Sequence, residues 1–205
     1  LNQIIWHAVT TGYSDLPRPK AYANDSLVTI INETLIREKV EKEIWVDVQN
    51  PANPLDPNDL IRIPLKEPFD VSTIKKFRIM EDWIFDAQHS DFRPTIIAIA
   101  PLYTMLSETG LELGEAALFW VKMDDLRPIL AQQEVFNRRN DASRLSYDQW
   151  FETRNFASHI VKRSNVYDAD INQLEEYRDN GEAALLESDE IRNDLYVLEH
   201  DLWEY

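Results

Sequence analysis

The sequence predicts an α+β fold, in which antiparallel strands and hairpins pack against flanking helices and an acidic amphipathic helix follows at the C-terminal end. Apolar runs with the length and alternation typical of strands are concentrated between residues 44 and 122. Apolar residues with helical spacing lie before and after this region. Beyond Asn165, acidic residues greatly outnumber basic ones while the helical spacing continues, which indicates a helix with one charged face.

Two helices are expected at the N-terminal end. In the first, the apolar residues between Leu1 and Val9 follow one helical face, and Gly12 is placed to end the helix in a left-handed conformation. The second is expected to begin at Asp25 or Ser26, since either side chain can accept a hydrogen bond from a free backbone N–H. Its expected buried side consists of Leu27, Ile30, Ile31 and Leu35.

The next two elements are expected to be half-buried strands at residues 44–48 and 61–65, because apolar and polar residues alternate there with a period of two. The loop between them contains Pro51, Pro54 and Pro57, which cannot donate to a sheet ladder. The two strands should therefore be joined by a long connection.

The centre of the sheet is predicted farther along the chain. Bulky residues indicate a strand from Phe77 to Asp86. The continuous apolar run from Thr95 to Ala100 suits a strand covered on both faces, and Pro101 is expected to end it. Residues 117–122 repeat this apolar pattern and complete the predicted sheet.

Capping residues predict further helices after the sheet. Asp124 is a candidate N-cap, and Ser146 with Gln149 forms a candidate capping box for a helix that begins at Tyr147. A last strand is expected at residues 157–162. The side chains expected to face inward from the helix after Asp124 are Leu126, Ile129 and Leu130.

The C-terminal segment has a different composition from the rest of the chain. We expect residues 1–165 to form an α+β core domain and residues 166–205 to form an acidic helical extension. Within the extension, apolar spacing predicts an amphipathic helix from Gly181 to Trp203. Its acidic face is the candidate surface for a basic partner. The candidate partner-binding residues are Asp189, Glu190, Asp194 and Trp203.

Composition excludes several classes of function. A formal net charge of −16 over 205 residues argues against binding to nucleic-acid phosphates or to anionic lipid headgroups. The sequence contains no run of about 18 apolar residues, so we expect no direct membrane insertion. It also contains 0 cysteines, which removes disulfides and thiolate chemistry.

The sequence contains no recognisable catalytic motif. The 4 histidines lack a second ligand at helical spacing, and the 4 glycines are too dispersed for a phosphate-binding loop. Oxygen ligands for calcium occur between residues 50 and 59, but turn formation is the favoured interpretation of their Asn-Pro and Asp-Pro pairs. We therefore expect a binding or scaffold protein without a catalytic site, a cofactor or a metal. The oxygen ligands considered are Asn53, Asp56, Asn58 and Asp59.

Six separated stretches carry a resemblance to a known family. They read WIFD at 83–86, IIAIAPLY at 96–103, LFWVKMDDL at 118–126, EVFN at 134–137, NDASRLSYD at 140–148 and EHDLWE at 199–204. In this order they resemble the PorN/GldN family, and the resemblance extends over nearly all of the chain. Family members begin upstream with a signal peptide, whereas this sequence begins at Leu1, so an upstream segment is expected.

The resemblance implies a non-enzymatic, periplasmic subunit of the type IX protein secretion system. Such a subunit assembles in many copies with a PorK/GldK-like outer-membrane lipoprotein into a ring, and the periplasmic part of a PorM/GldM-like motor protein contacts this ring. The alternative is a periplasmic or cell-envelope hydrolase with a dispersed acidic site, for which Asp124 and Asp125 are examples of paired acids. The resemblance identifies no contact residues, so the partner-binding role of the acidic helix is predicted from its concentration of charge and its aromatic end.

Overall fold

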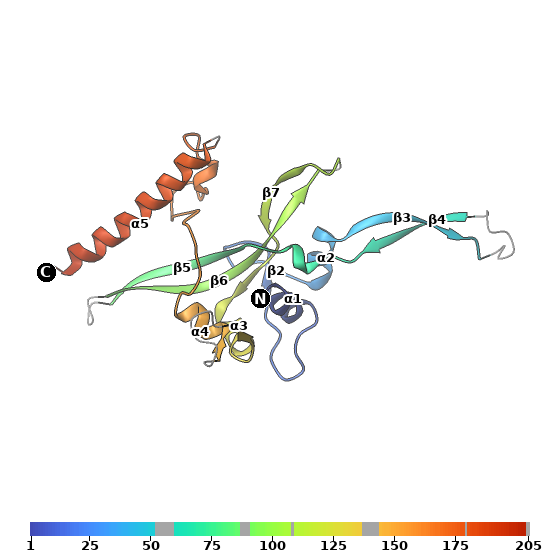
Figure 1. Cartoon of the computed structure of the whole chain (residues 1–205), viewed down its shortest axis with the longest axis horizontal. Coiled ribbons are helices and arrows are strands. Elements are labelled where there is room, and N and C mark those ends of the chain that lie inside the picture. Colours follow the sequence, from blue (N-terminus) through green and yellow to red (C-terminus); the bar gives the residue numbers. More distant parts are fainter. Residues whose placement is uncertain (52–59, 87–90, 108, 137–143, 179, 204–205) are drawn as a thin grey trace. The chain divides into compact units, whose positions relative to one another are not determined.

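The computed structural model describes residues 1–205 except 52–59, 87–90, 108, 137–143, 179 and 204–205 (Figure 1). The described residues form antiparallel sheets and helices, which confirms the predicted α+β class. They divide into two compact units, residues 1–81 with 96–149 and residues 82–95 with 150–205. The division of the chain at residue 165 stays a prediction.

The first helix, α1 (Asn2–Thr10), confirms the expected N-terminal helix. Its core-facing residues Ile5, Ala8 and Val9 are buried. Gly12 ends the helix with a φ of 80°, and its N–H donates to the His7 carbonyl over 2.7 Å. A side chain at this position would be strained, because the left-handed region favours glycine.

The main sheet has six strands in the order β2-β1-β8-β6-β5, with β7 paired to β6 (Figure 1). Their bounds are β1 Ala21–Tyr22, β2 Ile30–Ile31, β5 Phe77–Asp86, β6 Asp91–Leu106, β7 Glu112–Ala117 and β8 Trp120–Lys122. β5 has the predicted bounds. The two-residue strands β1 and β2 were not predicted.

The second predicted helix begins later than expected. Residues Ile30–Ile31 form β2, and α2 spans Glu33–Val40. The N-cap is Asn32, whose Oδ1 accepts from the Leu35 N–H over 3.0 Å, so the assignment to Asp25 or Ser26 was wrong. The physical reason lies upstream, where Leu27 has a positive φ of 54° and interrupts any helix. Of the expected buried side, Ile30 and Leu35 are exposed, and Ile36 is buried in their place.

The predicted core strand lies at the centre of the fold but does not end at Pro101. Ala98, Ile99 and Ala100 are fully buried, and β6 continues beyond them to Leu106. At Pro101 the strand changes partner, from β8 before it to β7 after it. A residue without an N–H is tolerated at such an interruption of the ladder.

The helices after the sheet are α3 (Met123–Leu130) and α4 (Tyr147–Glu152), with the short pair β9 (Glu134–Val135) and β10 (Leu145–Ser146) between them. The N-cap of α3 is Lys122, so Asp124 lies in the first turn rather than at the cap. The Ser146–Gln149 capping box is confirmed by reciprocal hydrogen bonds of 3.1 and 3.2 Å. The predicted inward side chains Leu126, Ile129 and Leu130 are buried.

The second unit contains α5 (Gly181–Trp203) and the 3₁₀ turn η2 (Ile171–Gln173). The strand expected at residues 157–162 is not formed. The Ile160 N–H instead donates to Ser188 Oγ of α5 over 2.8 Å, which satisfies its backbone without a strand partner. A small core joins these parts, built from Ile171, Ala184 and Ile191 with Ile160 and Tyr177.

Candidate functional site

The acidic side of α5 is the surface predicted for a partner, and the helix has the predicted bounds, Gly181–Trp203. It carries seven Asp and Glu residues against one arginine. Asp189, Glu190 and Asp194 are all exposed, as a contact surface requires. Trp203 is the last residue of the helix, and its side chain lies outside the described part of the chain. The role of these four residues in partner binding stays a prediction.

Two of the three acids already have a basic neighbour within the second unit. Asp189 pairs with Arg192 one turn along the helix, with an N–O distance of 2.9 Å. Asp194 lies 3.4 Å from Arg163 of the segment before η2. All four side chains are at least half exposed, so these pairs contribute little to stability and can be exchanged for others.

The N-terminal half of α5 is the part that is packed. Ser188 is buried, and Ala184 and Ile191 face the small core of the second unit. The Tyr177 hydroxyl donates to Glu187 Oε2 over 2.9 Å, and this hydrogen bond to a carboxylate raises the pKa of Tyr177. Farther along the helix, the Leu198 side chain is 47% exposed.

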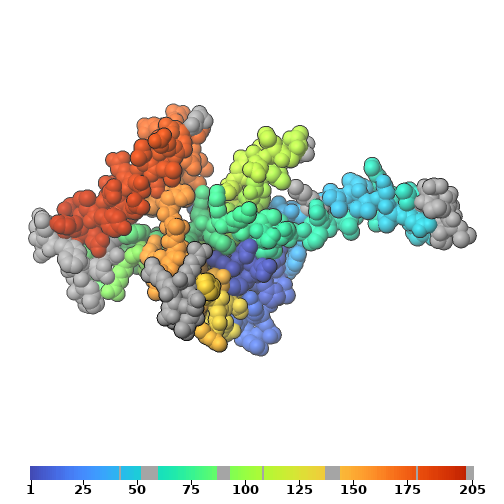
Figure 2. Space-filling model, in the orientation of Figure 1, coloured from blue at the N-terminus to red at the C-terminus, as the bar shows by residue number. Residues whose placement is uncertain are grey.

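A second surface was not anticipated from the sequence. The strands β3 (Lys42–Gln49) and β4 (Leu60–Glu67) form a separate two-stranded sheet, which we call the hairpin arm (Figure 1). Both strands were predicted, but the prediction that they are half-buried was wrong. Every residue of β4 is exposed, and in the space-filling view the arm is not covered by the helices of the first unit on the side shown (Figure 2).

One side of the hairpin arm is continuously apolar. Side chains alternate across a strand, and directly paired residues share a side. The register therefore puts three opposed pairs on one side, which we call the apolar face: Ile44 with Leu65, Val46 with Ile63 and Val48 with Ile61. Val46 is half-buried, whereas the other five are between 36% and 52% exposed.

The opposite side of the arm is mixed: it carries Leu60 and Pro64 together with charged pairs that favour this register. Glu43 is paired with Lys66, and Asp47 with Arg62, whose Nε lies 3.0 Å from Asp47 Oδ1. A shift by one residue would separate these opposite charges and would move the apolar face to the other side. Trp45 also lies on this side and is 62% exposed.

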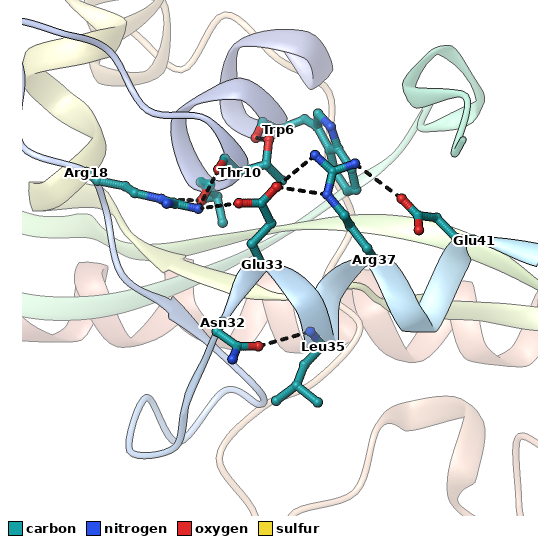
Figure 3. Close-up of polar contacts among 9 residues, drawn as sticks. Trp6, Thr10, Arg18, Asn32, Glu33, Leu35, Arg37 and Glu41 are labelled. Atoms are coloured by element: carbon teal, nitrogen blue, oxygen red, sulfur yellow. Dashed lines mark hydrogen bonds and ion pairs between the residues drawn. The ribbon is translucent and has the colours of Figure 1, made fainter. Parts of the chain in front are cut away.

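The helix α2 directly precedes the arm, and Figure 3 shows the polar contacts around this helix. The Arg37 guanidinium lies between Glu33, at 2.8 Å, and Glu41, at 3.2 Å, and it lies over the Trp6 ring at 5.9 Å. Glu41 is the residue that ends α2, directly before β3 begins. Arg37 therefore links α2, the start of the arm and α1.

The charges of this network support one another. The hydrogen bond from Arg37 is the largest cause that lowers the pKa of Glu33, and Arg18 contributes in the same direction. The bonds to Glu33 and Glu41 raise the pKa of Arg37. Arg18 also donates to the backbone carbonyls of Val9 and Thr10, so Glu33 is linked to the C-terminal end of α1 (Figure 3).

Two more contacts hold the first unit together around the arm. Lys39 Nζ donates to the Leu118 carbonyl over 3.0 Å, and burial lowers the pKa of Lys39. Beyond the other end of the arm, the Phe69 ring lies 5.3 Å from that of Trp6. Both ends of the arm are thus fixed to the same helix, α1.

The described residues contain no group of three or more metal-ligating side chains. The loop considered for calcium lies almost entirely outside the described residues. Asp124 and Asp125 lie in the first turn of α3, where the helix dipole stabilises their negative charge. None of the helices in the described part of the chain is long and apolar enough to cross a membrane.

Two surfaces of the described residues are thus exposed, the acidic side of α5 and the hairpin arm. A family model described as "Gliding motility associated protein GldN" matches residues 1–204, and the chain belongs to this family. The family is associated with gliding motility and type IX secretion and is not a known enzyme family. A search among curated proteins gives no match.

Proposed function

We propose that the protein is a non-enzymatic structural subunit of the type IX secretion system. It forms a periplasmic ring with a PorK/GldK-like outer-membrane lipoprotein and contacts the periplasmic part of a PorM/GldM-like motor protein. Membership of the GldN family over residues 1–204 is the observation that carries this proposal. The lipoprotein, rather than this chain, supplies the attachment to the outer membrane.

The acidic side of α5 is the surface that we assign to a partner. Asp189, Glu190 and Asp194 present carboxylates to solvent, and Trp203 ends the helix. A basic partner would be attracted at long range and would replace Arg192 and other neighbours as the counterion. This exchange costs little, because exposed ion pairs are worth only about 0–1 kcal/mol.

The assembly itself is tested by producing the full-length protein together with the lipoprotein and imaging the purified particles. We expect rings that contain both proteins. In a strain that lacks the gene, we also expect loss of secreted cargo proteins and its recovery on complementation. Separate monomers of the two proteins under the same conditions, with secretion unaffected, would contradict the proposal.

The role of α5 is tested by the triple variant Asp189→Lys, Glu190→Lys, Asp194→Lys. We expect weaker co-purification with the lipoprotein or the motor protein, because attraction becomes repulsion. The matched control is Asp15→Lys, Glu38→Lys, Glu112→Lys, which makes the same change in net charge at exposed positions of the first unit. Equal recovery of the partner with both variants would remove α5 from the interface.

A further inference from the structure

The C-terminal half of β6 has an open edge. On one side, residues 102–106 of this strand pair with β7. On the other side, the partner strand β5 begins only at Phe77, and the carbonyl of Lys76 directly before it accepts from the Leu102 N–H over 3.0 Å. Within the described residues, no strand pairs with β6 beyond this bond on the β5 side.

The hydrogen-bonding groups of this edge point outward at alternate residues. In an antiparallel pair, both backbone groups of one residue face the partner strand and those of the next residue face away. The Leu102 N–H points away from β7, whereas the Ser107 N–H points to the β7 side and donates to the Leu111 carbonyl over 2.8 Å. The N–H and C=O groups of Thr104 and Leu106 therefore face the open side. Both residues are exposed, and an extended backbone is the complement of such an edge.

A groove of about 410 Å³ lies between this edge and the 3₁₀ turn η1 (Val71–Thr73). We call it the edge groove. Asp70 fixes the η1 wall, because its carboxylate accepts from the Ser72 N–H and hydroxyl over 2.9 and 2.8 Å, and its carbonyl accepts from the Thr73 hydroxyl over 2.7 Å. The polar residues that line the groove are Ser72, Thr73, Lys75, Lys76, Thr104 and Glu115.

The edge groove is closed at one end. Because the Lys76 carbonyl occupies the Leu102 N–H, an added strand cannot continue past Thr104 along the line of β5. A segment antiparallel to β6 has its carboxyl end at this point, whereas a parallel segment has its amino end there.

The charge at the closed end favours a carboxyl group. Lys75 and Lys76 both line the groove. Lys76 already has a counterion, since its Nζ lies 2.8 Å from Glu115 Oε1. Among the residues that the structure describes, Lys75 has no acidic partner, and its side chain is exposed. An ammonium group in this position attracts a carboxylate and disfavours a second amine.

We propose that the edge groove binds the free C-terminal end of another polypeptide, in an extended conformation antiparallel to β6. The backbone of this segment pairs with Thr104 and Leu106, and its terminal carboxylate binds Lys75. The formal charge of the whole chain is −16, so the segment is neutral or basic apart from its end, because further carboxylates would be repelled. The contact is short and therefore weak by itself.

Binding is tested with random eight-residue peptides that are displayed with free C-terminal ends and selected on the full-length protein. An enriched peptide is then synthesised with a C-terminal carboxylate and with a C-terminal amide. We expect the carboxylate form to bind about tenfold more tightly, since the amide form loses a charge-assisted hydrogen bond. Failure to enrich any peptide, or equal affinities of the two forms, would overturn the proposal.

The pairing with the strand edge is tested at Thr104. Thr104→Pro removes the outward N–H and leaves the ladder between β6 and β7 complete, because this N–H faces away from β7. We expect it to abolish peptide binding, whereas Thr104→Val keeps the N–H and retains binding. Circular dichroism and thermal unfolding check that both variants are folded. Retained binding by a folded Thr104→Pro would contradict strand addition.

The role of Lys75 is tested without any change to the strand. Lys75→Glu should weaken binding of the carboxylate peptide and leave the affinity for the amide peptide unchanged. Lys66→Glu, the same change of charge at an exposed position of the hairpin arm, is the control. Equal effects of Lys75→Glu on both peptides, or equal effects of the two variants on the carboxylate peptide, would remove Lys75 from the site.

The inference goes beyond the proposed function and can fail separately from it. Peptide binding is measured on the purified chain and needs neither the lipoprotein nor a ring. Rings without peptide binding would leave the proposed function and remove the inference, and peptide binding without rings would do the reverse.

Discussion

The rings of Trp6 and Phe69 lie 5.3 Å apart at an interplanar angle of 48°, and this contact joins α1 to the segment that follows the hairpin arm. The same Trp6 ring lies beneath the Arg37 guanidinium, which precedes the arm. One side chain of the first helix therefore contacts both ends of the arm.

Trp6→Ala should destabilise the protein. The substitution removes the ring contact and the cation–π contact together, so we expect a loss of about 2–3 kcal/mol in the free energy of unfolding. Chemical denaturation of the purified chain measures this loss of stability. Trp45→Ala is the matched control, because Trp45 is 62% exposed on the arm, and we expect a change within about 0.5 kcal/mol. Similar losses for the two variants would show that Trp6 does not hold the arm.

Glu33 should make stability depend on pH in the acid range. Its pKa is lowered in the folded protein, so its contribution is fully present above the unfolded pKa and is lost as the pH falls through the folded value. The Glu33 side chain is 36% exposed and screened by solvent, which limits the effect to about 1 kcal/mol. Urea denaturation at pH 7, 5 and 3 should show that Glu33→Gln loses less stability on acidification than the wild type.

The matched control for Glu33 is Glu38→Gln, an exposed position on the same helix. We expect this variant to retain the acid dependence of the wild type. If Glu33→Gln followed the wild-type curve as well, the Arg37 network would have no part in the pH response.

The hydrogen bond from Tyr177 to Glu187 should be visible in the titration of the phenol. The carboxylate raises the pKa of Tyr177 above its ordinary value of 10.0. Stability from this bond is therefore present below the unfolded pKa and is lost as the pH rises through the folded one. Nuclear magnetic resonance of labelled tyrosine should show a lower pKa for Tyr177 in Glu187→Gln, and no such change in Glu182→Gln.

Gly12→Ala should cost about 1 kcal/mol of stability, because alanine is strained at a positive φ. Gly12 has a φ of 80°, and an added Cβ would approach Arg18 to 3.7 Å, so the strain comes from the backbone rather than from a clash. Gly181→Ala, at the start of α5 with nothing within 4 Å of its Cβ, is the control, and we expect it to be neutral or slightly stabilising. Thermal unfolding of the two variants distinguishes the two positions, and an equal melting temperature would contradict the assignment.

Local patterns predicted those elements whose signals lie within a few residues. The bounds of β5 follow from its run of bulky residues. The Ser146–Gln149 capping box follows from two side chains that hydrogen-bond to nearby backbone N–H groups. The strands β1 and β2 could not be predicted, because two residues carry no period. They exist as strands because β1 pairs with both β2 and β8. Residues 157–162 have a strand-like composition, but the Ile160 N–H among them donates to the side chain of Ser188 in α5.

The candidate surfaces differ in the same way. The acidic side of α5 could be predicted from composition, because the charged side chains of a helix face solvent whatever the rest of the fold. The exposure of the hairpin arm could not be predicted from the sequence. Alternation at residues 44–48 and 61–65 shows which side is apolar but not what covers it. The register of the two strands and the exposure of β4 show that the apolar face is uncovered.

The double attachment of the arm has a mechanical consequence. The chain enters the arm after Glu41, which Arg37 holds, and leaves it before Phe69, which Trp6 holds. A pull on the arm would therefore be divided between two strands, both of which are anchored at Trp6 of α1. Neither strand bears the whole load, and α1 receives the force at both anchors, so tension reaches the body of the first unit without first peeling one strand from the other.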